Sequence, residues 1–125
     1  MRDKVLKLLG LMRKANAIAI GETNTGAAAR SGKAKLLLIA ADASDNARRR
    51  AEGFAAGRGL ETVLLPFTKA EISANVGVSG CSMAAVLDTG FAGALMKALE
   101  EAFPGEYETV AWETSKSIGK RRNSV

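Results

Sequence analysis

Apolar residues recur along this chain at two spacings, which alternate from one segment to the next. Residues 2–15 carry apolar side chains three and four positions apart, the spacing of an amphipathic helix with one buried face. Residues 36–40 form a solid apolar run, which is typical of a strand covered on both faces. The pattern therefore predicts helices alternating with strands.

The same reading predicts the full order of elements. We expect helices at 2–15, 23–31, 45–56, 69–77 and 90–102, and strands at 17–20, 36–40, 62–65 and 83–87. The expected helix starts are Thr23 or Asn24, Ser44, Thr68 and Thr89, and the expected ends include Asn16 and Gly77. Thr68 and Glu71 have the spacing of a capping box, in which each side chain binds the other residue's free backbone N–H.

Strands that alternate with helices imply an α/β fold with helices on both faces of a mixed sheet. The 125 residues suit one domain that buries enough surface to fold without a disulfide or a metal. Only 5% of the residues are aromatic, so the core must consist mainly of Ala, Leu, Val and Ile. The pattern by itself fits several three-layer folds.

Pro104 and Gly105 interrupt the last predicted helix. We therefore expect residues 1–104 to form the domain and residues 105–125 to be a weakly ordered basic extension. Val110 and Trp112 are the residues of this extension that can dock as a strand. Residues 120–122 are all basic and add either electrostatic affinity for a polyanion or only a flexible end.

Charge is distributed unevenly along the chain. Residues 1–50 hold eleven basic and four acidic side chains, whereas residues 51–115 hold three basic and nine acidic ones. The last ten residues carry four basic side chains and no acidic one. Such polarity predicts a local attraction for polyanions, or simply an uneven solvated surface. Nucleic acid is favoured over membrane lipid because no basic amphipathic helix with bulky aromatic residues is present.

The side chains that commonly perform catalysis are scarce. The chain has no histidine, which removes the commonest general base and the commonest metal ligand, and no cofactor is expected. Cys81 is the only cysteine, and a lone thiol suggests a reducing, cytoplasmic compartment. No histidine is present to activate it as a nucleophile. The N-terminal residues alternate charged with apolar side chains, which predicts neither a signal peptide nor a membrane anchor.

Residues 21–26 have the glycine spacing of a phosphate-binding loop between a strand and a helix. Such a loop needs a lysine after its second glycine and then a Ser or Thr to hold magnesium. Ala27 and Ala28 occupy those positions, so an ATPase fails at its two decisive residues. Asp42 and Asp45 have the spacing of an acid–base pair, but carboxylates before a helix ordinarily cap it. No pair of residues requires an enzyme.

Two basic clusters are candidate contacts for nucleic acid. Arg48, Arg49 and Arg50 span about half a helical turn, so their side chains fan outward and suit a solvated surface. Arg30, Lys33 and Lys35 bracket the end of the second helix and the start of the central strand. We expect these three to lie at one edge of the molecule, beside a helix N-terminus, and to clamp phosphates.

Several segments together resemble a known family. In order they are Leu8-Leu9-Gly10-Leu11, Ile20-Gly21-Glu22, Ser31-Gly32-Lys33-Ala34-Lys35-Leu36, Ala41-Asp42-Ala43-Ser44, Ile72 to Gly77, and Asp88-Thr89-Gly90-Phe91-Ala92. They resemble the bacterial YlxQ-type proteins of the kink-turn-binding ribosomal protein superfamily, which contains archaeal L-seven-Ae and eukaryotic L-thirty-e. The resemblance covers about residues 4–99 and implies a three-layer α/β/α sandwich around a four-stranded mixed sheet, without enzymatic activity.

The resemblance also implies where RNA would bind. In the family the RNA surface comprises the start of the second helix, the turn after the central strand and the loop before the last strand. The matching residues here are Gly21, Glu22, Thr23 and Asn24; Ala41 and Asp42; and Val78, Ser79, Gly80, Cys81 and Ser82. Gly21 would let the backbone approach the RNA, its polar neighbours would address sheared G·A pairs, and the small-residue loop would pack beneath a flipped-out nucleotide.

The chain departs from the family pattern at three places. Ala27 stands where the family usually has a lysine that contacts guanines, and losing that contact costs roughly 1–3 kcal/mol of base discrimination. The usual Asn-Glu pair falls on Thr23-Asn24, and Ser73 replaces a usual glycine. Arg30 or Lys33 is a candidate substitute for the missing lysine.

The sequence is therefore interpreted as a non-catalytic, ribosome-associated module whose partner is structured, kink-turn-like RNA. Neither a membrane nor a small-molecule substrate is expected. One alternative is a protein-interaction module on the same fold, suggested by the acidic segment 51–115. The other is a small phosphate-handling enzyme.

Overall fold

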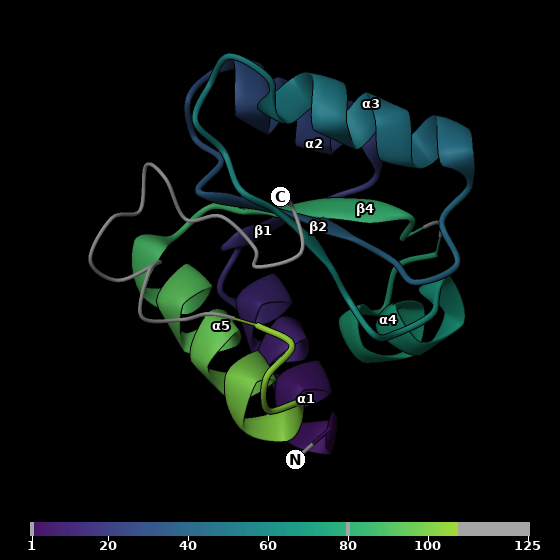
Figure 1. The fold of residues 1–125 in the computed structure, drawn as a ribbon, viewed down its shortest axis with the longest axis vertical. Helices are drawn as coiled ribbons and strands as arrows, with labels where there is room; N and C mark the ends of the chain where they lie inside the picture. The colour runs from purple at the N-terminus through teal and green to yellow at the C-terminus, as the bar shows by residue number, and fades with distance from the viewer. Residues whose placement is uncertain (1, 80, 108–125) are drawn as a thin grey trace.

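The computed structural model describes residues 2–79 and 81–107. Helices and strands alternate through most of the chain, as the apolar pattern predicts (Figure 1). In chain order the elements are α1 (Arg2–Lys14), β1 (Ile18–Ile20), α2 (Glu22–Arg30), β2 (Leu36–Ile39), α3 (Asp45–Ala55), β3 (Thr62–Leu64), α4 (Lys69–Val76), β4 (Met83–Val86) and α5 (Thr89–Ala102).

The strands form one mixed sheet with the spatial order β1-β4-β2-β3. Strands β2 and β3 are parallel, whereas β4 lies antiparallel to both of its neighbours, β1 and β2. Ile20 at the end of β1 pairs with Ala84, and Ile39 at the end of β2 pairs with Met83. The ends of β1, β2 and β3 and the start of β4 therefore share one edge of the sheet, which we call the loop margin.

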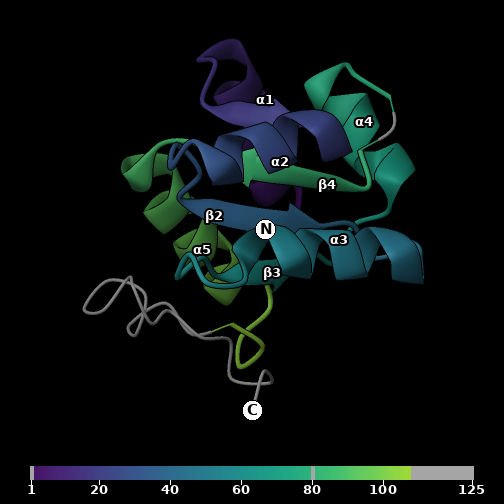
Figure 2. The same ribbon diagram turned by 90° about the horizontal axis from the view of Figure 1, so that it is seen from above.

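Helices cover both faces of this sheet, which confirms the predicted three-layer α/β/α sandwich. Helices α2 and α3 pack together on one face, and α1 packs with α4 and α5 on the other (Figures 1 and 2). The central strand β2 is buried along its whole length because it is covered on both sides. The solid apolar run at residues 36–40 indicated this burial.

The two faces of the sheet are packed differently. On the α1–α4–α5 side, large side chains such as Leu9, Phe67 and Leu95 are fully buried. On the α2–α3 side the buried residues are mostly alanines, so these two helices lie close together. A Cβ atom on Gly26 would lie 2.8 Å from the Phe54 ring. A side chain at position 26 would therefore force the Phe54 ring to move.

Most of the predicted helix boundaries are confirmed. Asn16 ends the first helix with a left-handed φ of 57°. The Ser44 side chain accepts a hydrogen bond from the N–H of Ala47 at the start of α3. The capping box of Thr68 and Glu71 is complete, and Gly77 ends α4 in the left-handed conformation.

Two helix starts differ from the prediction. Helix α2 begins at Glu22 with Gly21 as its N-cap, so neither Thr23 nor Asn24 caps it. The backbone already turns sharply at Gly21, and the Asn24 amide instead donates to the Ile20 carbonyl, 3.0 Å away. Helix α5 is capped by Asp88 rather than Thr89, because the Asp88 carboxylate reaches the N–H of Phe91 at 2.9 Å.

The described chain continues a few residues beyond the break at Pro104. Tyr107 is buried, and its hydroxyl donates a 2.6 Å hydrogen bond to the Leu64 carbonyl of β3. The predicted docking of Val110 and Trp112 and the basic residues 120–122 lie outside the described residues. The proposed domain boundary at residue 104 stays a prediction.

Candidate nucleic-acid interface

Two backbone hydrogen bonds join the loop margin. The N–H of Gly21, after β1, donates to the Met83 carbonyl at 3.0 Å, and the N–H of Ala40, after β2, donates to the Ser82 carbonyl at 2.9 Å. Both acceptors lie where the loop at residues 78–82 enters β4. The start of α2, the turn after β2 and this loop are thus neighbours, as the sequence analysis expected.

The β1–α2 turn presents a short polar surface. Gly21 has φ 95° and ψ 163°, a conformation that side chains disfavour strongly. Because glycine has no capping side chain, the amides of the first turn of α2 receive no side-chain hydrogen bond at the cap position. Thr23 and Asn24 are exposed beside these amides. The turn can therefore offer backbone donors and two small polar side chains to a ligand.

The negative charge of Glu22 is balanced by an arginine from α3. Arg50 Nη1 lies 2.8 Å and 2.7 Å from the two carboxylate oxygens of Glu22. Both side chains are about half exposed, so the pair adds little to stability. The ion pair instead changes the local charge. Because Arg50 neutralises Glu22, the start of α2 does not present an uncompensated carboxylate to an anionic ligand.

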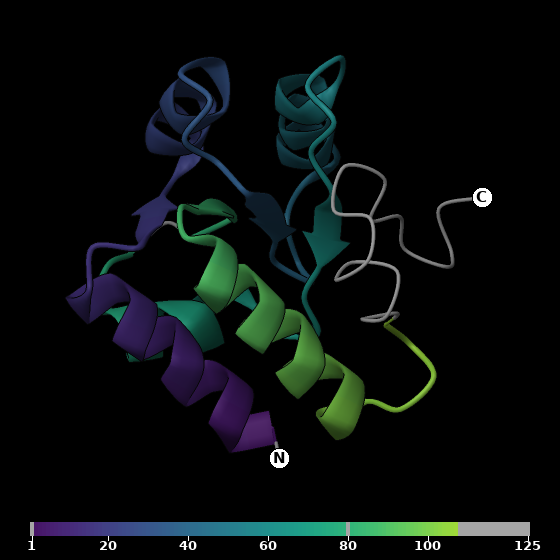
Figure 3. The same cartoon turned by 90° about the vertical axis from the view of Figure 1, so that its left-hand side faces the viewer.

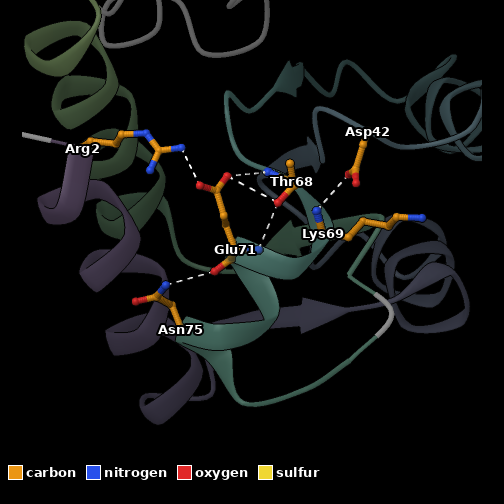
Figure 4. Close-up of polar contacts among 6 residues, drawn as sticks. All are labelled: Arg2, Asp42, Thr68, Lys69, Glu71 and Asn75. Carbon is orange, nitrogen blue, oxygen red and sulfur yellow. Dashed lines mark hydrogen bonds and ion pairs between the residues drawn. The ribbon is translucent and has the colours of Figure 1, made fainter.

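The turn after β2 is held from two directions. The N–H of Ala41 donates to the Phe67 carbonyl at 2.8 Å, and Arg48 Nη2 donates to the Ala41 carbonyl at 3.3 Å. The Asp42 carboxylate accepts from the backbone N–H of Lys69 at 2.8 Å (Figure 4). Ala41 and Asp42 remain exposed, but one carboxylate oxygen of Asp42 is engaged in fixing α4 to the turn.

Helix α4, which precedes the loop at 78–82, is anchored to α1 through Glu71. The Glu71 carboxylate accepts from the Thr68 backbone N–H at 2.9 Å and from Arg2 at 2.7 Å (Figure 4). Arg2 also lies over the Phe67 ring, 4.9 Å from its centroid. The hydrogen bond from the Thr68 backbone and then the contact with Arg2 hold the pKa of Glu71 below its ordinary value of 4.5.

The loop at 78–82 differs from the expectation in one residue. Cys81 is 1% exposed, and its thiol donates to the Val78 carbonyl at 3.0 Å, so it cannot itself touch RNA. It braces the loop from inside, because a small apolar thiol fits the core at this position. Ser79 is exposed and Val78 and Ser82 are partly exposed, whereas Gly80 lies outside the described residues.

The predicted basic clamp is in the wrong place for the loop margin. Lys35 donates its N–H to the Val86 carbonyl at 2.7 Å, and β2 begins there, at the opposite end of the sheet from Met83. Arg30 ends α2, and Lys33 follows it toward the same end. The expectation that these cations lie beside the N-terminus of α2 is wrong, because the helix carries the chain from one end of the sheet to the other.

An open groove of about 660 Å³ connects the loop margin with part of this distant basic region. It follows α2 and the edge strand β1, with Asn24 and Val78 lining it together with Ala27. Lys33 and Arg13 line it as well. The groove therefore joins the polar turn, the apolar side chain of Val78 and two cations in a single concave surface.

Two arginines of α3, expected from the sequence to form only a solvated surface, contact the loop margin. Arg48 and Arg50 support the turn after β2 and the start of α2, as described above, and Arg49 donates to the Asn46 side chain at 3.0 Å. The Arg48 Nε atom is buried and has no hydrogen-bond partner among the described residues. The helical spacing of the three arginines showed that their side chains fan out, but only the packing of α3 beside α2 directs two of them to the loop margin.

The described residues contain neither a metal-binding cluster nor a membrane-spanning helix. Residues 2–79 and 81–107 contain no cluster of three or more His, Cys, Asp or Glu side chains arranged to hold a metal ion. Within the same part of the chain, no helix has the length and apolarity needed to cross a membrane.

Comparisons with known proteins support the fold. No protein family and no curated protein matches the chain by sequence. A protein of unknown function from Bacillus halodurans has a similar structure, with a TM-score of 0.70, 22% identity, and coverage of 78% of this chain and 97% of that one. A 15.5 kD RNA-binding protein from Giardia lamblia is also similar, with a TM-score of 0.60, 20% identity, and coverage of 77% of this chain and 82% of the other. Both likenesses concern the α/β/α architecture.

Proposed function

We propose that this protein binds folded RNA without catalysing a reaction, and that its target is a kink-turn-like element in ribosomal or other structured RNA. The carrying observation is that residues 21–24 and 78–82 lie side by side at the loop margin, where the N–H of Gly21 donates to the carbonyl of Met83, the residue that directly follows the loop. The Giardia protein of the same fold is an RNA-binding protein, which supports the same class of ligand here. We place this activity in the cytoplasm.

The loop margin suits the kink of such an RNA. Thr23, Asn24 and the free amides of the first α2 turn can address exposed base edges, while Val78 supplies an apolar surface for a flipped-out base. Structured RNA is recognised mainly through such splayed bases and through shape, because the deep groove of an intact duplex admits no side chains. A small polar surface beside an apolar one fits this mode of binding.

The groove along α2 suits the phosphate backbone that leaves the kink. It leads from Asn24 past Ala27 to Lys33 and Arg13, whose cations can neutralise phosphates. Lys33 therefore keeps a role, although at the far end of the groove and not at the kink. Arg30 and Lys35 lie at the same end of the sheet and can add to its positive potential.

The test is a fluorescence titration with a kink-turn RNA and with a fully paired duplex of equal length. We expect tighter binding of the kink-turn RNA. Log affinity should fall linearly with log salt, with a slope of about −0.9 for each neutralised phosphate of a duplex-like site. Val78→Asp should abolish the preference for the kink-turn by placing a carboxylate against the flipped base. If neither RNA binds at low salt, the proposal fails.

Ala27→Lys tests whether the groove meets the kink. Ala27 is exposed one turn along α2 from Thr23, so a lysine there should tighten kink-turn binding by roughly 1–3 kcal/mol. Ala56→Lys adds the same charge at the other end of the α2–α3 layer, at an exposed position outside the groove, and is the matched control. Equal tightening by both variants would indicate only a general effect of charge.

A further inference from the structure

A second hollow lies on the opposite side of the molecule, between α1 and α5. These two helices run side by side in opposite directions on the face of the sheet that α2 and α3 do not cover (Figure 3). The hollow has a volume of about 630 Å³ and is open to solvent. None of its lining residues belongs to the loop margin or to the groove along α2.

The floor of this hollow is apolar and open to solvent. Leu8 and Leu11 come from α1, and Ala94 and Ala98 face them from α5. The hollow exists because the alanine side chains are too short to fill the space between the helices. Leu11 is 53% exposed, although it continues the apolar face of its helix. An exposed apolar patch with a polar rim is typical of a surface that binds another molecule.

The rim of the hollow is predominantly basic. Lys4 forms a 3.5 Å ion pair with Glu101, which leaves Lys7 and Lys97 without an ion-pair partner in the described part of the chain. The rim therefore presents an excess of positive charge on both helices. It is complementary to a ligand that carries carboxylates on either side of an apolar strip.

We propose that this hollow between α1 and α5 binds an amphipathic helix of a partner protein, with leucine-like side chains on the floor and flanking carboxylates against Lys7 and Lys97. The furrow between two packed helices accepts the side-chain ridge of a third helix. An RNA backbone would use the lysines but leave the leucine floor in water. A lipid surface prefers a protruding apolar face to a hollow one. The hollow and the groove along α2 share no lining residue, so both can be occupied together.

The test uses the full chain and a designed helical peptide of about 18 residues, which spans about five turns. The peptide carries leucines at positions i, i+3, i+4 and i+7 with glutamates on both flanks, and a matched peptide has lysines in place of the glutamates. We expect only the acidic peptide to shift the backbone amide signals of Leu8, Leu11, Ala94 and Lys97. The double variant Lys7→Glu with Lys97→Glu should weaken its binding by about tenfold or more.

Leu11→Glu separates the floor from the rim, since it places a charge on exposed surface without disturbing the buried face of α1. It should also abolish binding of the acidic peptide while leaving the affinity for RNA unchanged. This pair of measurements keeps the inference independent of the proposed RNA function, because either binding activity can fail alone.

Four outcomes would overturn the inference. The first is equal binding of both peptides, and the second is a set of shifted amides that lies elsewhere. The third is concentration-dependent self-association that Leu11→Glu abolishes, which would show that the hollow binds a second copy of this chain. The fourth is binding to vesicles containing phosphatidylserine that the same variant abolishes, which would assign it to lipid.

Discussion

At the scale of single residues, the backbone of Gly21 determines the shape of the β1–α2 turn. Its φ of 95° and ψ of 163° lie in a region that is essentially restricted to glycine, whereas Gly77, with φ 75° and ψ 17°, lies in the left-handed region that asparagine tolerates. A Cβ atom at either position would meet no atom within 4 Å. Any difference between substitutions at these two sites must therefore come from backbone conformation.

We predict that Gly21→Asn lowers the free energy of unfolding by roughly 1–3 kcal/mol, because asparagine cannot adopt this conformation without strain. Gly77→Asn is the matched control and should cost only a few tenths of a kcal/mol. Urea denaturation of both variants measures the difference. Equal losses would show that conformational strain at Gly21 is not the determining factor.

At the scale of elements, two contacts fix α4, and with it the approach to the loop at 78–82. Gly10 lets α1 approach α4 so closely that a Cβ atom would lie 2.9 Å from the Asn75 carbonyl oxygen. Arg2 of α1 binds Glu71 near the start of α4 (Figure 4). Helix α4 is thus positioned against α1 at both of its ends.

Gly10→Ala should destabilise the fold by about 1–3 kcal/mol, because the carbonyl that the methyl group meets belongs to a helix backbone and cannot move alone. Gly53→Ala in α3 should instead stabilise it by about 0.5–1 kcal/mol, since nothing lies within 4 Å of the new methyl group. Thermal or urea unfolding of the pair distinguishes packing from helix propensity. A stabilising Gly10→Ala would disprove the close contact.

The bonds of Glu71 predict a dependence of stability on pH. The folded state lowers the pKa of Glu71. The ionised carboxylate therefore stabilises the fold at pH values above the ordinary pKa of 4.5, and this contribution is lost as the pH falls through the lower pKa of the folded state. The difference in unfolding free energy between the parent and Glu71→Gln should therefore be largest near neutral pH and shrink in acid. Glu101→Gln, which removes only the exposed pair with Lys4, is the control and should show little dependence.

At the scale of the whole molecule, the chain has two cationic surfaces that share no lining residue. Lys33 lines the groove along α2, and Lys97 borders the hollow between α1 and α5 on the other layer. If RNA occupies only the first surface, reversal of the two charges must have different effects, although the net charge of the protein changes equally.

Lys33→Glu should weaken RNA binding and reduce the slope of log affinity against log salt by about one phosphate, or roughly 0.9. Lys97→Glu should change neither quantity by more than the small effect of net charge. Both slopes come from titrations at several salt concentrations. Equal reductions would mean that RNA is attracted by the overall charge of the protein.

The sequence by itself determined the order of the elements and most of their ends. Local patterns suffice for this purpose, because apolar spacing distinguishes helices from strands and side chains such as Ser44 and Thr68 satisfy backbone groups only a few residues away. Two helix starts were predicted wrongly, and their actual N-caps are Gly21 and Asp88. These starts also depend on local contacts, but several neighbouring residues are suited to the same cap position. The pattern also indicated helices on both faces of a mixed sheet, and the family resemblance selected the four-stranded α/β/α sandwich among the three-layer folds that the pattern allows.

Only the tertiary structure decided which side chains share a surface. The length of α2 carries Arg30 away from Gly21, and the antiparallel pairing of β4 brings residues 78–82 back to the loop margin. Cys81 is buried in the core among side chains from distant segments, and Arg50 of α3 reaches Glu22 of α2. Such placements depend on sheet order and helix packing, which arise from long-range contacts that local spacing does not encode.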